Sequence, residues 1–171
     1  MKLFDIYEAG AVMRYHTKRT AAPRQTVADH TWGACVIMMW LYYPDLPPNK
    51  MLQYMLLHDV PEVITGDMPA PAKWRSERLK AALIELEDKV GAELGLPLLP
   101  NDDPVVSYCD NAELAMHSIA QCKMGNRFYF RTAGLGIERM HQFVDKMTSD
   151  VMRLKARELT ENLQGEVNDL R

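Results

Sequence analysis

The stretch HDVPEVITGDMPAPAK, residues 58 to 73, follows directly on the apolar run MLQYMLL. Residues 49 to 58 carry apolar side chains at helical spacing and predict a largely buried helix. Pro61 favours an end to that helix near His58, because proline disfavours the helical conformation in the residue before it. His58 and Asp59 therefore stand at the end of a buried helix. Two adjacent polar side chains are unexpected there unless they bind a partner.

Beyond that helix end the sequence predicts an irregular segment from residue 64 to residue 72, because Gly66, Pro69 and Pro71 oppose regular structure. Elsewhere apolar residues recur with a helical period, and no segment alternates as a strand does. Further helices are expected at residues 3–13, 26–43, 74–94, 104–125 and 137–168. The sequence therefore predicts an all-α fold in a single domain, residues 1–171.

Several helix boundaries carry their own signals. Thr26 is a residue type that caps helix starts, and Asp103 followed by Pro104 is typical of a helix start. The segment NRFYFRTAGLG, residues 126–136, contains two glycines and predicts an interruption before the final long helix. These signals predict helices joined by loops, with no linker that would divide the chain.

The composition excludes several classes of protein. The chain has 171 residues, 47% of them hydrophobic, which suffices for one substantial core. A net charge of −3 gives no reason to expect binding to nucleic acid polymers or anionic membranes. The longest apolar stretch, residues 35–43, is shorter than the roughly 20 residues that span a bilayer. No signal peptide opens the chain and the three cysteines show no paired spacing, so a cytoplasmic protein with free thiols is expected.

Four side chains from three expected helices could bind one metal ion. They are His30, His58, Asp59 and Asp110. Two imidazoles and two carboxylates suit a divalent transition metal and leave positions open for water and substrate. His117 competes as a ligand because it lies two helical turns beyond Asp110 on the same face. His30 is favoured because it stands in a polar first turn.

Each candidate ligand also has an ordinary structural explanation. A lone buried histidine is more often a hydrogen-bonded core residue than a ligand. Asp110 is flanked by apolar residues at helical spacing and is costly to bury without a cation or hydrogen-bond donors. A salt bridge with an arginine such as Arg131 would provide that cation without a metal. Spacing alone leaves both explanations open.

The same residues resemble a known family. The order His30, then His58-Asp59, then Asp110 is similar to the H…HD…D signature of the HD-domain phosphohydrolases. Residues 58 to 73 resemble the bacterial 5′-deoxynucleotidase branch, which reads HD-x-x-E-x-x-T-G-D-x-P-x-P-x-K, at every fixed position. RYHTKRTAAPRQTVADH resembles the R-W…N-V-S-E-H segment of that branch, with Tyr15 in place of the tryptophan, and MGNRF resembles its G-N-x-F turn.

This resemblance implies a bundle of helices around one divalent metal ion (Co, Mn, Zn or Fe), ligated by His30, His58, Asp59 and Asp110. It implies a 5′-deoxynucleotidase that converts a deoxynucleoside monophosphate to the deoxynucleoside and phosphate. The branch also contains compact phage enzymes that remove triphosphate from dATP, so a deoxynucleoside triphosphohydrolase is the alternative. A non-catalytic nucleotide-binding or sensor module is the alternative of another class. The resemblance also implies a homo-oligomer, a dimer or larger.

Two further carboxylates are candidate catalytic residues. Glu62 lies four residues, one helical turn, beyond His58 and could orient or deprotonate the attacking water. Asp67 stands in the Thr65-Gly66 turn and is a candidate to protonate the leaving 5′ oxygen. Without the motif, Glu62 would be taken for a surface carboxylate at a helix end and Asp67 for a turn-forming residue.

The expected substrate contacts are spread over two loops. Arg14 is expected to donate to the phosphate as a planar fork, and Lys73 to act as a mobile positive charge. Lys18 could meet a longer phosphate chain, although such a loop is more often only solvated. Tyr15 takes the place of the aromatic that in the family packs near sugar and base. Pro71 could form a stiff wall of the pocket.

Overall fold

The computed structural model describes residues 3–21, 24–73, 75–96 and 103–170. In these ranges the chain is helical and contains no strand, only an isolated antiparallel bridge between Met13 and Thr26. None of the helices in these ranges is both long enough and apolar enough to cross a membrane. The predicted all-α fold is therefore confirmed.

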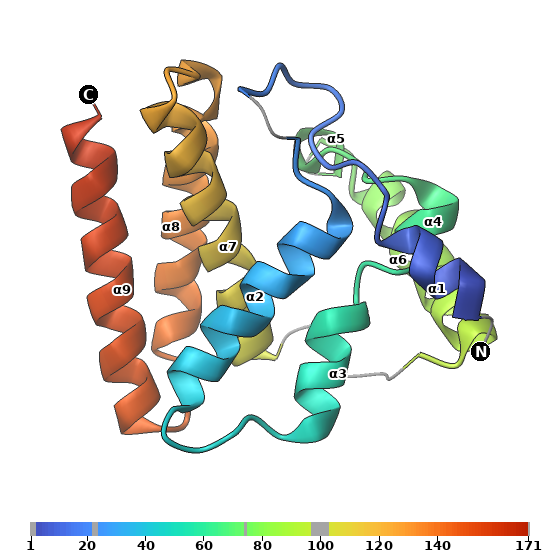
Figure 1. Cartoon of the computed structure of the whole chain (residues 1–171), viewed down its shortest axis with the longest axis horizontal. Coiled ribbons are helices and arrows are strands. Elements are labelled where there is room, and N and C mark those ends of the chain that lie inside the picture. The colour runs from blue at the N-terminus through green and yellow to red at the C-terminus, as the bar shows by residue number, and fades with distance from the viewer. Residues whose placement is uncertain (1–2, 22–23, 74, 97–102, 171) are drawn as a thin grey trace.

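The helices follow one another along the chain, and residues 10–26 form a long connection between the first two (Figure 1). They are α1 (Leu3–Ala9), α2 (Val27–Tyr42), α3 (Asn49–Leu57), α4 (Glu62–Thr65), α5 (Ala70–Lys73), α6 (Glu77–Leu94), α7 (Pro104–Lys123), α8 (Phe130–Val144) and α9 (Asp150–Asp169). A 3₁₀ turn, η1 (Arg127–Tyr129), leads from α7 into α8. The long helices α7, α8 and α9 stand side by side with α2 across them, and α1, α4, α5 and α6 gather on the other side.

The predicted caps of α2 and α7 are confirmed. Thr26 and Asp29 form a reciprocal capping box, in which the Thr26 hydroxyl accepts from the Asp29 N–H and the Asp29 carboxylate accepts from the Thr26 N–H. The Asp103 carboxylate accepts from the N–H groups of Val105 and Val106. Because each cap satisfies backbone donors that the helix cannot, the starts of α2 and α7 are fixed by local sequence.

The predicted interruption at 126–136 and the single final helix at 137–168 are wrong. The segment forms η1 and the first half of α8, and the break comes later, between Val144 and Asp150. Ser149 caps α9 by accepting from the Met152 N–H. Gly136 lies inside a helix, and its small size lets α8 pack closely on α7. An added Cβ would lie 3.1 Å from Asn111 O on α7. Gly136, which helps to predict a loop, therefore permits close contact between helices instead.

The expected irregular segment at 64–72 is partly wrong as well. Residues 62–65 form the one-turn helix α4, which Gly66 ends with a φ of 68°. Residues 70–73 form the short helix α5. Prolines are compatible with α5 because they stand at its start, where a missing N–H breaks no helical hydrogen bond. The first helix is shorter than expected and ends at Ala9.

The buried side chains form two clusters. The larger one joins α2, α3, α7, α8 and α9 and includes the fully buried Tyr108, whose hydroxyl donates to Ala156 O at 2.8 Å. The smaller one joins α1 and α6 to Val60 in the turn after α3. Met55 belongs to the larger cluster and Val60 to the smaller. The His58-Asp59 turn therefore crosses from one cluster to the other.

The close approach of α7 and α8 leads to a stability prediction. At Gly136 an added methyl group would meet backbone and Cβ atoms of α7 at 3.1–3.2 Å, and backbone cannot move aside. We expect Gly136→Ala to lower the free energy of unfolding by about 1–2 kcal/mol in urea titrations. Gly134→Ala in the same helix has nothing within 4 Å and is the matched control. It should raise that free energy by about 0.5–1 kcal/mol, and equal effects of both variants would contradict the packing role.

Candidate active site and metal centre

His58 is oriented by the last turn of α3. Its Nδ1 lies 2.8 Å from Met55 O, and because a carbonyl only accepts, the Nδ1 atom carries the hydrogen. Nε2 is then the atom with a free lone pair, and it lies 3.1 Å from Asp59 Oδ1. The helix end thus presents an imidazole nitrogen and a carboxylate to the same point, as a metal ligand pair requires.

His30 is held in the same way from another helix. It is fully buried in the first turn of α2, and its Nδ1 lies 2.5 Å from Glu113 Oε2 on α7. Its Nε2 has no hydrogen-bond partner among the described residues, although Asp110 Oδ1 lies 3.0 Å away and Asp59 Oδ2 3.6 Å away. A buried nitrogen with a free lone pair and two carboxylates beside it is arranged as a cation ligand.

Glu113 also belongs to this group of side chains, although it was not predicted from the sequence. It is buried, and its second oxygen accepts from Gln25 Nε2 at 2.6 Å. Gly33 leaves room for it, because a Cβ there would lie 2.9 Å from Glu113 Cγ. Its position three residues after Asp110, one turn along the same helix face, was the signal available in the sequence.

The predicted ligands converge. Nitrogens of His30 and His58 and an oxygen of Asp110 all lie within 4.8 Å of one another. Asp59 completes the group through its contacts with both histidines. The competing assignments do not enter this group: the His117 ring stacks on Tyr15, and the ion-pair partner found for Asp110 is His30. The geometry thus brings together all four residues predicted as ligands.

The electrostatics of this group call for a positive charge at its centre. Burial lowers the pKa of His30, but the Asp110 and Glu113 carboxylates beside its two ring nitrogens outweigh burial and raise the pKa to about 10. Burial raises the pKa of Asp110, whereas the His30 hydrogen bond and charge hold it well below its usual value. The His58, Arg14 and His30 charges likewise lower the pKa of Asp59 despite its burial. Ionised carboxylates enclosed in this way need a cation beside them, whether a proton on imidazole or a metal.

Arg14 and Glu62 flank the four converging residues. Arg14 donates from Nη1 to Asp59 Oδ2 at 2.8 Å, and its side chain is only 12% exposed. Glu62 is buried at the start of α4, and its Oε2 has no hydrogen-bond partner among the described residues. Burial and the Asp59 charge raise the pKa of Glu62 to about 8. A carboxyl group with a pKa near neutrality can exchange protons at physiological pH.

An aromatic group adjoins Arg14. The Tyr15 and His117 rings are parallel with centroids 5.1 Å apart, and the Tyr129 ring meets both edge-on. Lys18 Nζ lies 4.7 Å from the Tyr129 ring centroid and donates to Thr132 Oγ1 at 2.6 Å. Lys18 is thus tied to α8, so its charge is directed at the aromatic rings.

The remaining predicted site residues lie around α4 and α5. Lys73 ends α5, and its charge lowers the pKa of Glu62, so it acts on the same site. Asp67 follows the Gly66 turn and accepts from the Tyr15 N–H at 2.9 Å. Pro71 is in α5, but its side chain lies outside the described part of the structure. The substrate-binding and catalytic roles of these residues remain predictions.

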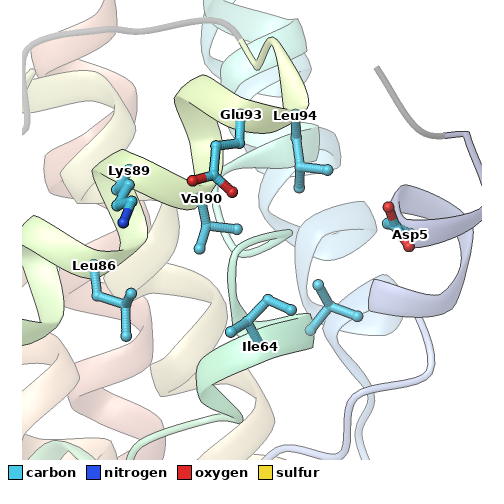
Figure 2. Close-up of a pocket in the computed structure, with 8 residues that line it drawn as sticks. Asp5, Ile64, Leu86, Lys89, Val90, Glu93 and Leu94 are labelled. Atoms are coloured by element: carbon cyan, nitrogen blue, oxygen red, sulfur yellow. The ribbon is translucent and has the colours of Figure 1, made fainter.

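A separate pocket of about 390 Å³ opens on another side of α4 (Figure 2). Figure 2 shows Ile64 of α4 directed toward Leu86 and Val90 of α6, with Asp5 of α1 at the rim. The full lining is Asp5, Val63, Ile64, Leu86, Lys89, Val90, Glu93 and Leu94. None of the predicted site residues lines this pocket, so it is distinct from the His30-centred site.

Comparison with known proteins agrees with this geometry. A family profile described as "5′-deoxynucleotidase YfbR-like" matches residues 6–103, more than half of the chain. A dATP triphosphohydrolase of Cyanophage S-2L is 28% identical over 126 residues, which are 68% of this chain and 70% of the relative. The 5′-deoxynucleotidase PM0747 of Pasteurella multocida is 34% identical over 86 residues, 46% of this chain and 44% of the relative.

A solved structure shares the fold over almost the whole length. It is the Cyanophage S-2L HD phosphohydrolase (DatZ) bound to dA and one catalytic Zn²⁺ ion, with a TM-score of 0.71 and 22% identity. The likeness covers 99% of this chain and 98% of that one. The predicted HD-domain fold and nucleotide phosphohydrolase class are therefore confirmed. The chain belongs to the YfbR-like 5′-deoxynucleotidase family.

Proposed function

We propose that this chain hydrolyses 2′-deoxynucleotides in a metal-dependent reaction, cleaving the ester between the 5′ oxygen and the innermost phosphate. The leading assignment is a 5′-deoxynucleotidase, since the matching family carries that description. The observation that carries the proposal is the convergence of Asp59 and Asp110 on Nε2 of the fully buried His30. A buried imidazole nitrogen that faces two carboxylates is arranged to share a cation with them.

The four converging residues fit a divalent transition metal. Bonds of about 2.1 Å place two ligand atoms at most about 4.2 Å apart on one ion. The two nitrogens and the oxygen all lie within 4.8 Å of one another, which comes close to that limit. Imidazole and carboxylate donors suit Zn, Co, Mn or Fe, and the zinc named in the cyanophage structure favours zinc. When bound, the ion supplies positive charge to a phosphate oxygen and acidifies a water molecule.

The chain's own side chains perform the remaining tasks. Arg14 neutralises phosphate charge from the edge of the site, and Lys73 adds a second positive charge from α5. Glu62 accepts the proton of the attacking water, because its buried carboxylate has an oxygen without a partner. Tyr15 lies beside Arg14 and offers an aromatic surface to the sugar and base of the nucleotide.

A deoxynucleoside triphosphohydrolase is the second candidate. The phage dATP triphosphohydrolase matches a larger share of both chains than the bacterial nucleotidase does. Lys18 is the residue expected to meet a longer phosphate chain, but its ammonium donates to Thr132 and lies over the Tyr129 ring. Because these contacts already engage that charge, the monophosphate stays the leading substrate.

A nucleotide panel with added zinc, cobalt or manganese tests the function. Release of inorganic phosphate from dAMP and the other deoxynucleoside monophosphates is the expected result. Release of triphosphate from dATP would instead establish the second candidate. Binding of deoxynucleotides without hydrolysis of either class would overturn both and identify a sensor module. Ribonucleotides in the same panel measure the preference for the deoxy sugar.

Glu113 gives a prediction that concerns metal affinity alone. Replacing its carboxylate in Glu113→Gln weakens the acceptor that holds His30 Nδ1–H at 2.5 Å. We expect metal affinity, measured by competition with a chromophoric chelator, to fall about 10- to 100-fold. Glu85→Gln, on the exposed face of α6, is the control. An affinity within about twofold of the wild type would remove Glu113 from the metal site.

We also propose that a second copy of this chain packs on α2. The helix is apolar around its whole circumference: Ala34, Met38 and Leu41 are buried inside, while Trp32, Val36, Met39 and Trp40 are 42–69% exposed. A helix that is apolar all round is normally covered on all sides. Light scattering should therefore give at least twice the chain mass, and Val36→Lys should lower it to one chain. An unchanged mass for Val36→Lys would place the interface elsewhere.

A further inference from the structure

The turn after α4 is hydrogen-bonded to the loop before α2, far away in sequence. The backbone N–H of Tyr15 donates to Asp67 Oδ2 at 2.9 Å across 52 residues. Tyr15 has a φ of 55°, and within the described ranges no other non-glycine residue has a positive φ. Side chains other than glycine rarely adopt this left-handed conformation, so it persists only where neighbouring contacts enforce it.

The left-handed conformation of Tyr15 makes the side chains of Arg14 and Tyr15 point in different directions. Arg14 and Tyr15 are adjacent, yet the Arg14 guanidinium reaches Asp59 while the Tyr15 ring stacks on His117. The Arg14 N–H also donates to Gln25 O, which fixes the chain on the other side. Because of the conformation at Tyr15, the Arg14 side chain points to the metal ligands and the Tyr15 side chain points to the aromatic group.

Asp67 is itself held firmly in place. Gly66 has a φ of 68°, and its N–H donates to Glu62 O at 2.7 Å, which ends α4. The carboxylate thus projects from a turn that begins at Glu62. One turn carries both Glu62 and Asp67. The hydrogen bond from Tyr15 to Asp67 therefore fixes the position of Arg14 relative to Glu62.

We propose that Asp67 is a positioning residue: it clamps Tyr15 in the left-handed conformation and so aims Arg14 and Tyr15 at the substrate. This role differs from proton donation to the leaving oxygen, because it uses Asp67 Oδ2 as an acceptor from backbone and needs no ionisable proton. The inference deepens the proposed function and rests on it. The positioning role also explains the Gly-Asp turn of the 58–73 stretch, because this turn joins that stretch to the loop before α2.

Two substitutions separate positioning from acid catalysis. Asp67→Asn keeps an oxygen that accepts from the Tyr15 N–H but has no ionisable proton, so its kcat/KM should stay within about fivefold of the wild type. Asp67→Ala removes the acceptor and should lower kcat/KM roughly 10- to 100-fold, mainly through KM, because Arg14 and Tyr15 lose their alignment. The same two changes at Asp88, exposed on α6, are the matched controls.

Amide hydrogen exchange gives a second readout that needs no substrate. The Tyr15 amide should be protected in the wild type and in Asp67→Asn, and should exchange faster in Asp67→Ala. Equal loss of kcat in both variants with unchanged protection would overturn the proposal in favour of an acid role. Unchanged exchange in Asp67→Ala would overturn it as well. Because exchange is independent of turnover, it decides the contact even if the deoxynucleotide assignment fails.

Discussion

Asp59→Ala is expected to reduce hydrolysis of deoxynucleotides below detection and to lower the metal content of the purified protein. Asp59 is the residue on which the site contacts converge, at 2.8 Å from Arg14 Nη1, 3.1 Å from His58 Nε2 and 3.6 Å from His30 Nε2. Its loss removes a ligand and leaves the nearly buried Arg14 guanidinium without its counter-ion. Both effects act in the same direction, so this variant should be the most damaging at the site.

The measurements for Asp59→Ala are elemental analysis of bound metal and the dAMP assay. Asp59→Asn preserves the size of the side chain and separates loss of charge from loss of packing, and it should also be inactive. Asp88→Ala, exposed on α6, controls for removal of any carboxylate. Circular dichroism should show unchanged helix content in all three. Full metal content together with wild-type turnover would rule out Asp59 as a ligand.

Glu62→Gln should have the second largest effect, and it should fall on kcat alone. The substitution keeps the volume and removes the proton acceptor, so we expect kcat to fall about 10²- to 10⁴-fold. Bound metal and the affinity for substrate should be unchanged, because Glu62 is not among the converging ligand atoms. This split distinguishes proton transfer from ligand loss, which Asp59→Ala represents.

Glu87 supplies a matched control for Glu62. It is a half-exposed carboxylate on α6 whose pKa is also raised by burial, and the charges of Lys73 and Asp59 act on it as well. Glu87→Gln should leave kcat within about twofold of the wild type, since this carboxyl is given no part in the reaction. If Glu62→Gln and Glu87→Gln behaved alike, the role of Glu62 as a base would have to be abandoned.

The sequence predicted structure correctly where the contacts that fix a helix start lie within a few residues of it. Thr26 and Asp103 mark the starts of α2 and α7 because a cap bonds to residues two or three positions away. Gly136 in α8 was misleading because the reason for it lies in another helix: it is small so that α7 can approach. A local pattern cannot distinguish a glycine that ends a helix from one that makes room for a neighbour.

The same distinction applies to the site. The HD motif and the surrounding pattern identified His30, His58, Asp59 and Asp110, which lie together in the structure. Glu113 escaped notice because its partner His30 is 83 residues away, and a carboxylate on a helix is usually solvated. The contact between Asp67 and Tyr15, across 52 residues, was hidden for the same reason.

The four candidate ligands come from α2, the turn after α3, and α7, and the turn also joins the two buried clusters. An ion held there would cross-link segments 80 residues apart in sequence, which the unfolded chain cannot do (His30 to Asp110). By thermodynamic linkage, free metal at 100 times its dissociation constant stabilises the folded state by about 2.7 kcal/mol. The midpoint of thermal melting would then record how much of a preparation is loaded with metal, before any substrate is added.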